Sequence, residues 1–521
     1  MKLLNKKYAV LILVFVLMAP LGCEKQLDVT NPNNPTPDIV KSEEGMKRQA
    51  LGLWNGGGGG WWEWVSWTLL EAMGDNVVLP WINFDWNRFF GNIELIEYSD
   101  GTAPWSPRMQ ASPSFSQTQW VNFVNDRQVT GGGYEAQWES AYRFNNEANR
   151  ILQALDSQGG VPFSSNAQEK EDAYRSWAHF WKGYAYQMVG LFYNKGLIID
   201  EPDATNSDYQ NSAQMIEAAQ AEYDLALQTA SSFGVIASAV IPDIFPTNIT
   251  TASYIQNIYT LKARALLMSK RRTNITQAEW QQIRDWANQG LMTNDGALVI
   301  DSDESTYLFA VTHRWRLATN IWARVSPRVV QVVNENPNGT DARAARFQFD
   351  SSGGTYANRV TQPQINSPWL VVAGTPYASQ SPGTPQFVVS AEENMLMLAE
   401  AELALGNPGT AADWVNQERK MPLQQAGLPD ETSVDMTTIR NERKIALFGR
   451  ALAFYDARRL GEIDSQADGG GVQGAWVYHI DSNQNLVLDS DASLFFDFLS
   501  YYDIPAAEQD FNPPVAGTPQ Q

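Results

Sequence analysis

Apolar residues recur every three or four positions through several stretches of the chain, which is the period of an amphipathic helix. These stretches come in pairs, and short runs of Gly, Pro, Ser or Asn separate the two members of a pair. The first pair carries its apolar stripes at Trp138, Tyr142, Ala148, Ile151, Leu152 and Leu155, and at Tyr174, Trp177, Trp181, Tyr184, Met188 and Leu191. The second carries them at Tyr254, Ile258, Leu261, Ala265 and Met268, and at Trp280, Ile283, Ala287 and Leu291. The third has Leu396, Ala399 and Leu403, then Gly406-Asn407-Pro408, then Ala411, Ala412 and Val415.

A helix, a short turn and a second helix, with small residues where the helices approach closely, are typical of tetratricopeptide-type repeats. The spacing of the pairs is irregular, so a plain helical bundle is the alternative. No stretch in the middle of the chain resembles a linker between domains. The pattern therefore predicts a mostly α-helical protein that forms a single domain.

Three stretches lack the helical period. They are Gly56–Gly60 with the tryptophan cluster after it, Thr102–Gln119, and residues 300–390, which are rich in Gly, Pro, Asn and Thr. We predict long loops there, with a few short strands. Loops of such length are usually either functional or disordered, and their many aromatic residues argue against disorder.

The first residues resemble a bacterial export signal. Lys2, Lys6 and Lys7 precede an apolar run from Tyr8 to Met18, which is too short to span a bilayer. Pro20-Leu21-Gly22-Cys23 follows as a lipobox, although Pro20 stands where an aliphatic residue is usual. Cys23 is the only cysteine, so it cannot form an intrachain disulfide. We expect acylation of Cys23 and an anchored protein, and an ordinary secretory signal is the alternative.

The net charge of the chain indicates which classes of partner are disfavoured. The chain has 37 basic and 58 acidic residues, and removing residues 1–22 takes away three lysines, which leaves a formal charge of −24. Such a surface disfavours nucleic acid as a partner. The Pro- and Asn-rich stretch Thr30–Pro37 is predicted to be an extended spacer between the anchor and the folded part.

A family resemblance comes from the last third of the chain. Residues 439–459, with Glu442, Arg443, Leu447, Asp456 and Arg459 in place, resemble the "ERRxELxFEGxRxxDLxR" helix of the SusD/RagB family of outer-membrane lipoproteins. Residues 502–513 are similar to the family's terminal "PIPxxExxxNP" segment, and 392–406 to its acidic Ala/Leu-rich helix. The early Leu27-Asp28 and the segment from Glu418 to Leu428 also fit the family. Asp503, Ala446, Arg450 and Ala453 depart from its pattern.

The resemblance implies a scaffold of about four tetratricopeptide-like helix pairs, decorated by loops that form a ligand site. It implies a signal peptide at 1–22, a lipidated tether at 23–40 and a helical domain at 41–521, with ligand-binding loops at about 54–135 and 296–390. Members of the family lie on the cell surface over a SusC-like, TonB-dependent transporter. They bind oligosaccharides, or peptides in some branches, without catalysis or cofactors.

The early loop supplies one set of candidate ligand residues. Gly74-Asp75-Asn76 and Pro80 interrupt the helical pattern and place Trp81 and Trp86 in a loop with Asn83, Asn87 and Arg88. A flat aromatic face covers the apolar side of a sugar ring, while amide and guanidinium groups bind its hydroxyls. By contrast, Trp61, Trp64 and Trp67 have helical spacing and are predicted to belong to the core.

The later loop supplies a second set, namely Tyr307, Trp315 and Trp322. The resemblance implies that an early and a later loop both contribute aromatic residues to the family's sugar site. Alternation of Trp315 and Leu317 with Arg314 and Arg316 also fits a half-buried strand, which is the alternative.

The remaining sequence patterns do not favour a metal site or a catalytic site. The histidines, His179, His313 and His479, are far apart in the sequence, so we expect no metal site. Asp481–Asn485 resembles a calcium loop, but Leu486 stands where glycine is required, and a hairpin turn is the simpler prediction. The acidic pair Glu392-Glu393 could act as the two catalytic carboxylates of a glycoside hydrolase only if the distance between the two carboxyl groups is suitable. A lipid-anchored glycoside hydrolase is therefore the alternative to a binding protein.

Overall fold

The computed structural model describes residues 40–55, 69–78, 93–105, 133–230, 249–300, 324–350, 367–372, 386–481, 483, 485–496 and 500–514. Its α-helices are α3 (Glu43–Asn55), α7 (Gly133–Asp156), α8 (Ala167–Phe192), α9 (Ser212–Ala230), α11 (Thr251–Met268), α12 (Gln277–Ala287), α15 (Pro327–Asn334), α16 (Ala391–Ala404), α17 (Pro408–Arg419), α18 (Met436–Ala446), α19 (Ala453–Leu460) and α20 (Ala506–Phe511). Residues 69–73 are also helical, and short 3₁₀ turns lie at Arg272–Asn274, Ala342–Arg346 and Gln466–Asp468. None of the helices in these ranges is long and apolar enough to cross a bilayer.

The strands are short and form several small sheets. They are β1 (Val77–Val78), β2 (Ile93–Glu97), β3 (Lys195–Leu197), β4 (Tyr209–Asn211), β5 (Val299–Ile300), β6 (Arg324–Val325), β7 (Phe347–Phe349), β8 (Trp369–Val371), β9 (Gln386–Phe387), β10 (Val472–Ile480) and β11 (Leu486–Phe496). The largest sheet has the order β10-β11-β2, and β1–β6, β3–β4, β5–β9 and β7–β8 are antiparallel pairs.

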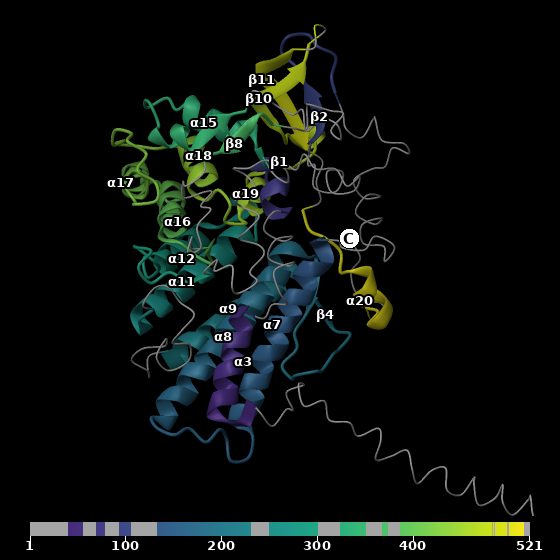
Figure 1. Ribbon diagram of the computed structural model, residues 1–521, viewed down its shortest axis with the longest axis vertical. Coiled ribbons are helices and arrows are strands. Elements are labelled where there is room, and N and C mark those ends of the chain that lie inside the picture. Colours follow the sequence, from purple (N-terminus) through teal and green to yellow (C-terminus); the bar gives the residue numbers. More distant parts are fainter. Residues whose placement is uncertain are drawn as a thin grey trace, which may run out of the picture.

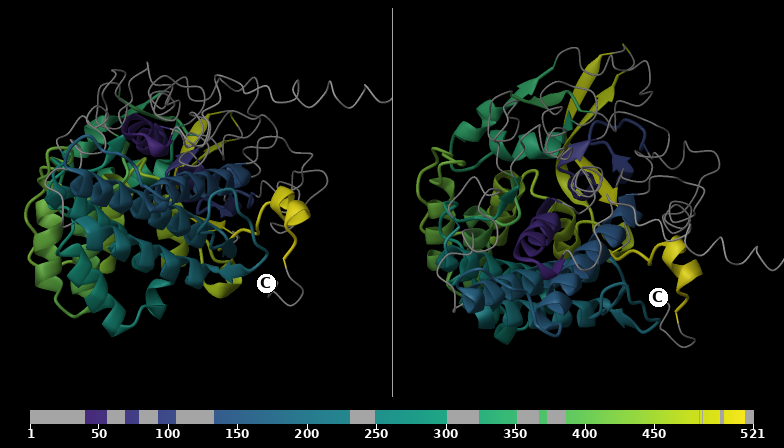
Figure 2. Two further views of the ribbon diagram at one scale, coloured as in Figure 1. Left: turned by 90° about the horizontal axis from the view of Figure 1, so that it is seen from below. Right: turned by 60° about the horizontal axis from the view of Figure 1, so that its bottom comes forward.

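The helices pack on one another as a continuous array. Helices α3, α7, α8 and α9 form one end of the molecule, and α11, α12, α16, α17 and α18 extend along one side (Figure 1). Helix α15 and the β10-β11-β2 sheet lie at the other end, and α20 stands apart from the array (Figures 1 and 2). The prediction of a mostly α-helical single domain with a few short strands is confirmed.

The predicted helix pairs are all present, as α7/α8, α11/α12 and α16/α17. Thr250 and Thr276 begin α11 and α12 with capping boxes, in which the threonine hydroxyl and the side chain three residues later each accept a backbone N–H. Gly406, with φ +88°, ends α16, and Pro408 occupies the first turn of α17. Between the first two pairs, α9 packs against α8 so closely that a Cβ on Gly183 would lie 2.7 Å from the Tyr223 ring.

Two predictions about element boundaries are wrong. The stretch 300–390 contains a helix, α15, because Ser326 accepts the N–H of Arg328 and Pro327 opens the helical turn. The motif at 439–459 is not one helix but two, α18 and α19. The chain turns between them, where Gly449 and Ala451 have φ of +71° and +61°. The predicted hairpin around Asp481 is confirmed, since β10 and β11 pair there and the Asp481 carboxylate accepts the N–H groups of Asn483 and Asn485.

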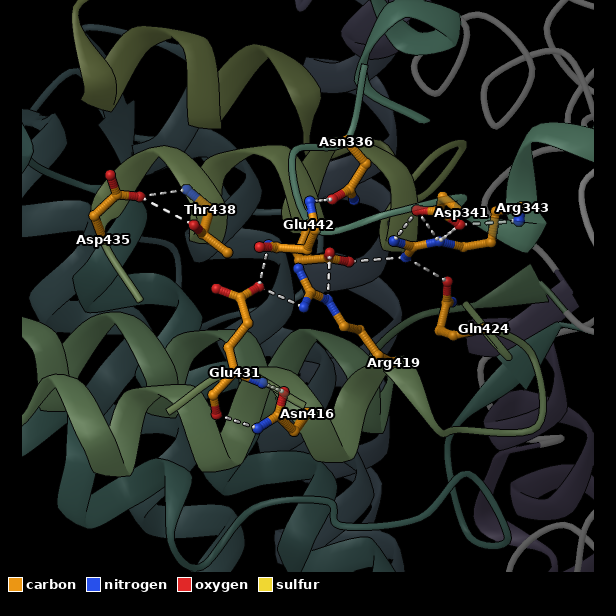
Figure 3. A network of polar contacts seen from close by, with 11 residues as sticks. Asn336, Asp341, Arg343, Asn416, Arg419, Gln424, Glu431, Asp435, Thr438 and Glu442 are labelled. Atoms are coloured by element: carbon orange, nitrogen blue, oxygen red, sulfur yellow. Dashed lines mark hydrogen bonds and ion pairs between the residues drawn. The ribbon is translucent and has the colours of Figure 1, made fainter. Parts of the chain in front are cut away.

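Side chains of the motif at 439–459 hold helices together from inside. The Glu442 carboxylate binds Arg419 at 2.7 Å and Arg343 at 2.8 Å, and all three side chains are buried (Figure 3). Arg459 donates to both oxygens of Glu400, at 2.6 and 2.7 Å, with neither side chain exposed. The motif therefore ties α18 and α19 to α16, α17 and the 3₁₀ turn at Ala342–Arg346.

Candidate functional site

The predicted ligand residues lie outside the described residues. Trp81, Asn83, Trp86, Asn87 and Arg88 belong to segment 79–92, Tyr307, Trp315 and Trp322 belong to segment 301–323, and Cys23 precedes the first described residue. Their positions therefore stay predictions. The described structure does include the residues that border both segments.

Two of those bordering residues lie in hydrogen-bonded strands. The early segment follows Val78 of β1, and the later one ends at Arg324 of β6. These strands pair antiparallel, with Val77 opposite Val325 and Val78 opposite Arg324. The ladder continues with a hydrogen bond of 2.9 Å from the Ser326 N–H to the Asn76 carbonyl. The fold thus brings one end of the early loop beside one end of the later loop, although 245 positions separate Val78 from residue 323 in the sequence.

A second strand pair, β7 and β8, borders a third segment, 351–366, next to β6. Phe349 of β7 lies opposite Trp369 of β8, and segment 351–366 connects the two strands. Strand β8 also contacts β6, and segment 373–385 begins just after it. We call β1, β6, β7 and β8 together the loop base.

Arg324 holds the loop base together. Its side chain is fully buried, and its Nη1 donates to the Ser367 carbonyl while its Nη2 donates to the Asp350 carboxylate, each at 2.9 Å. Ser367 and Asp350 are the two residues that border segment 351–366. A planar guanidinium with several fixed donors suits such a junction, because it fixes three chain ends in one geometry.

Beneath the ladder, a buried ion pair supports the loop base. Arg328 donates from Nε to Asp75 at 2.8 Å and makes a second contact through Nη2, while the Ser326 hydroxyl adds a bond of 3.2 Å to the same carboxylate. Burial by itself would raise the pKa of Asp75, but the positive charge of Arg328 and its hydrogen bonds hold that pKa below its ordinary value. The carboxylate is therefore ionised and keeps residues 74–76 in place.

An aromatic cluster lies at the edge of the loop base. Phe349 packs edge-on against Trp369 with ring centres 5.3 Å apart, and Tyr478 of β10 lies 6.1 Å from Phe349. The Trp369 indole donates to the Tyr478 hydroxyl at 3.2 Å, which fixes the orientation of the indole. Phe349 is 48% exposed, a large fraction for an aromatic side chain in a strand. We call Phe349, Trp369 and Tyr478 the aromatic trio.

No pattern in the sequence predicts the aromatic trio. Its members come from three strands that are distant in sequence, and the pattern around Tyr478 predicts a hairpin without indicating what lies beside it. A signal existed at Phe347 and Phe349, since alternate residues of a strand face opposite sides. Phe347 is buried, and so Phe349 projects to the other, open face.

The other candidate catalytic and metal-binding side chains are bound to neighbouring residues of the fold. Glu393 is buried and bonds Arg264, with a distance of 2.6 Å from the Arg264 Nε, and Glu392 is buried and accepts the Asn294 amide at 3.0 Å. Neither carboxylate is accessible for glycosidase chemistry. His179 lies on α8 with its Nδ1 2.6 Å from Glu222, and the described residues contain no group of acidic, His or Cys side chains arranged to hold a metal.

Comparisons with known proteins relate this geometry to a fold. No family model and no curated protein matches the sequence. A SusD superfamily protein from Bacteroides thetaiotaomicron superposes with a TM-score of 0.58, at 17% identity, over 92% of this chain and 100% of the other. A SusD-like carbohydrate-binding protein from Bacteroides fragilis gives 0.59, at 12% identity, over 92% and 100%. A third structure, solved with a xylogluco-oligosaccharide, gives 0.55, at 14% identity, over 91% and 98%. The chain has the SusD-like fold.

Proposed function

We propose that this chain belongs to the SusD family and captures oligosaccharides at the loop base. The proposal rests on one observation, namely that loop ends distant in sequence meet beside an aromatic cluster with an exposed phenylalanine, Phe349, within a SusD-like fold. Sugar rings present an apolar C–H face and a polar rim, so a site for them needs an aromatic surface next to hydrogen-bonding groups. The aromatic trio provides the first of these among the described residues.

The adjoining segments have the composition that completes such a site. Segment 79–92 contains Trp81, Asn83, Trp86, Asn87 and Arg88, and segment 301–323 contains Tyr307, Trp315 and Trp322. Because β1 pairs with β6, the residues that border one end of each segment lie side by side at the loop base. We propose that these eight residues and the aromatic trio contact the bound oligosaccharide.

Structural neighbours favour a sugar over a peptide as the ligand. Two proteins of similar fold are described as SusD-like carbohydrate-binding proteins, from Bacteroides vulgatus and Bacteroides fragilis, and one structure contains a xylogluco-oligosaccharide. We transfer this ligand class, and no particular sugar, to the present chain. Peptide capture and glycoside hydrolysis are the two alternatives that an experiment must separate from it.

We further propose a location and a partner. The lipobox at Cys23 would anchor the chain to the outer membrane, facing outward, and the residues up to 40 would serve as a tether. There the protein would cover a SusC-like, TonB-dependent transporter and deliver oligosaccharides to it. Binding without catalysis fits this role, because a captured ligand has to be released intact into the transporter.

A binding screen tests the proposed ligand. Residues 24–521 would be tested against a panel of oligosaccharides and a panel of peptides by calorimetry, and the length of any bound glycan would be measured after incubation. We expect binding to at least one oligosaccharide, with its chain length unchanged. Binding to peptides alone would favour the peptide-capturing alternative, and shortening of the glycan that a single carboxylate substitution abolishes would favour the hydrolase.

A further inference from the structure

Strand β10 lies at the border of the largest sheet, and part of its outer edge is uncovered. The strand order β10-β11-β2 pairs β10 with a neighbour on one side only. Such an edge presents main-chain N–H and C=O groups that can pair with whatever approaches it, which is why proteins usually cover an edge or keep it short. The direction of each main-chain group along β10 decides which of them face outward.

The hairpin end of β10 fixes these directions. The Asp481 N–H donates to the Asn485 carbonyl at 3.0 Å, so these two residues form a hydrogen-bonded pair. Hydrogen-bonded and non-hydrogen-bonded pairs alternate along an antiparallel ladder, so the next pair, Ile480 with Leu486, is not hydrogen-bonded. The same holds two residues earlier, at Tyr478. The main-chain N–H and C=O groups of Ile480 and Tyr478 therefore point away from β11.

Helix α15 covers the first part of this outer edge. The main-chain N–H of Trp476 donates to the Gln331 side chain at 2.9 Å, and the Trp476 carbonyl accepts from Arg328 Nη1 at 3.2 Å. The coverage ends there, because no described residue forms a hydrogen bond with the outward main-chain groups of Tyr478 and Ile480. We call these two N–H and two C=O groups the open edge.

The open edge begins at the aromatic trio. Tyr478 contributes its main-chain groups to the edge and its ring to the trio, where the Trp369 indole and the Phe349 ring hold that ring in place. Fixed donors and acceptors thus lie beside an aromatic surface, which is the combination that a sugar ring requires. Main-chain N–H and C=O groups suit sugar hydroxyls in particular, because each hydroxyl both donates and accepts.

Charged side chains next to the open edge favour a neutral ligand. The Glu335 carboxylate is exposed and accepts the Trp476 indole N–H at 2.7 Å, and Asp481 directly follows the open edge. Arg324 and Arg328 are buried, and each is paired with an aspartate. The solvent-facing charges of these four side chains are therefore negative, and they would repel an anionic sugar.

We propose that the open edge is the polar part of the ligand site, and that it takes a neutral oligosaccharide whose hydroxyl groups bind the main-chain groups of Tyr478 and Ile480. This inference rests on the proposed function and adds the class of sugar and the groups that hold it. A peptide could instead pair with the edge as an added strand. The open edge offers outward groups from two residues only, which is short for a strand partner and sufficient for one or two sugar units.

Hydrogen exchange of the parent protein, residues 24–521, tests the contact without any substitution. The probe is the oligosaccharide that binds the parent best, chosen from neutral glycans that include xylogluco-oligosaccharides and from acidic glycans that include galacturonate oligomers. We expect the best probe to be neutral and to slow exchange at the amides of Tyr478 and Ile480. The amide of Leu486 is the internal control, because it faces away from β10 on the other side of the same hairpin.

A matched pair of proline variants tests the same contact by affinity. Ile480→Pro removes one outward N–H, and an edge position of this kind tolerates proline. Leu486→Pro makes the same change on the opposite residue of β11, and Ile480→Val retains the N–H. Loss of one hydrogen bond should weaken binding of the probe to Ile480→Pro by about fivefold to tenfold. The other two variants should bind like the parent, and circular dichroism would verify that each variant is folded.

Several outcomes would overturn the inference while leaving oligosaccharide capture intact. They are unchanged exchange at both amides with the probe bound, parent-like affinity in Ile480→Pro, equal losses in the two proline variants, and preference for an acidic glycan. If Ile480→Pro does not fold, the exchange result alone decides. Binding of peptides alone, with protection of the same amides, would assign the open edge to an added strand. If no oligosaccharide binds the parent, the proposed function fails together with this inference.

Discussion

Glu418 on α17 is a fully buried carboxyl in which neither oxygen has a hydrogen-bond partner among the described residues. Burial raises the pKa of Glu418 well above its ordinary value, and the nearby negative charge of Glu442 raises it further, despite the opposing charge of Arg343. The group is therefore neutral in the folded protein at pH values where the unfolded chain would ionise it.

This shift makes stability depend on pH in a defined direction. Above the ordinary pKa of a glutamate, the unfolded state loses a proton that the folded state keeps, so the free energy of unfolding decreases as the pH rises. Glu418→Gln removes the titration, and the variant should gain stability relative to the parent between pH 4 and pH 7. Urea denaturation at several pH values would measure this gain. Glu217→Gln, at an exposed position on α9, is the control, and an equal pH dependence in parent and Glu418→Gln would contradict the account.

Trp181 illustrates the other extreme, an aromatic side chain that serves only packing. It is 3% exposed, and its ring lies 4.9 Å from Phe144 and 5.5 Å from Trp177. Trp181→Ala should cost about 3–5 kcal/mol of stability. Trp86→Ala should leave the melting temperature nearly unchanged and weaken oligosaccharide binding. A large fall in melting temperature for Trp86→Ala would assign Trp86 to the core instead of the site.

At the scale of elements, the turn between α18 and α19 depends on a distant side chain. The buried Glu71 carboxylate accepts the backbone N–H groups of Gly449 at 2.9 Å and Ala451 at 2.8 Å, and also the Asn76 amide at 2.8 Å. It thereby joins the turn to residues that lead directly into β1. The loop base and the α18–α19 turn are consequently one unit.

Glu71→Ala should therefore destabilise the protein strongly. Two backbone donors would lose their acceptor in the interior, and an unsatisfied buried group costs about 1–3 kcal/mol, so we expect a total of roughly 2–6 kcal/mol. Chemical denaturation would measure this loss. Glu44→Ala, which removes an exposed carboxylate on α3, should change stability by less than about 1 kcal/mol. Similar losses in the two variants would refute the role assigned to Glu71.

The same elements indicate how far sequence reasoning extends. The pairs α7/α8, α11/α12 and α16/α17 were predictable because large apolar residues mark one face of each helix. Helix α9 lacked such a mark, since Ala219, Ala226 and Ala230 form much of its buried face. Helix α15 contains four valines, which favour strands, and its local capping by Ser326 prevails over that preference. The break after α18 depends on Glu71, about 380 positions away, and no local pattern encodes such a contact.

The candidate site was predictable only in part, for a related reason. The motif that suggested the family consists of buried ion-pairing residues such as Glu442 and Arg459, which define the scaffold and carry no information about the ligand. Aromatic content identified the two loops as candidates. The pairing of β1 with β6 and the assembly of the aromatic trio are long-range contacts that became visible only in the structure.

At the scale of the whole molecule, the proposed function requires both a membrane anchor and an accessible loop base. Cys23→Ala should release the protein from the membrane fraction, because each buried CH₂ of an attached acyl chain contributes about 0.8 kcal/mol to anchoring. Fractionation of cells followed by immunoblotting would measure the distribution. An integral outer-membrane protein in the same samples serves as the control. A variant that stays in the membrane fraction as completely as the parent would contradict lipidation at Cys23.

The most direct test of glycan capture at the loop base is the dissociation constant of Phe349→Ala for the oligosaccharide that binds the parent best. Phe349 is 48% exposed, so its removal should cost little stability. Loss of an aromatic contact at the centre of a binding site costs about 2 kcal/mol, and we therefore expect affinity to fall about thirtyfold. Leu225→Ala, at a 41% exposed position on α9, should bind like the parent. Unchanged affinity in a folded Phe349→Ala variant would contradict the placement of the ligand on the aromatic trio.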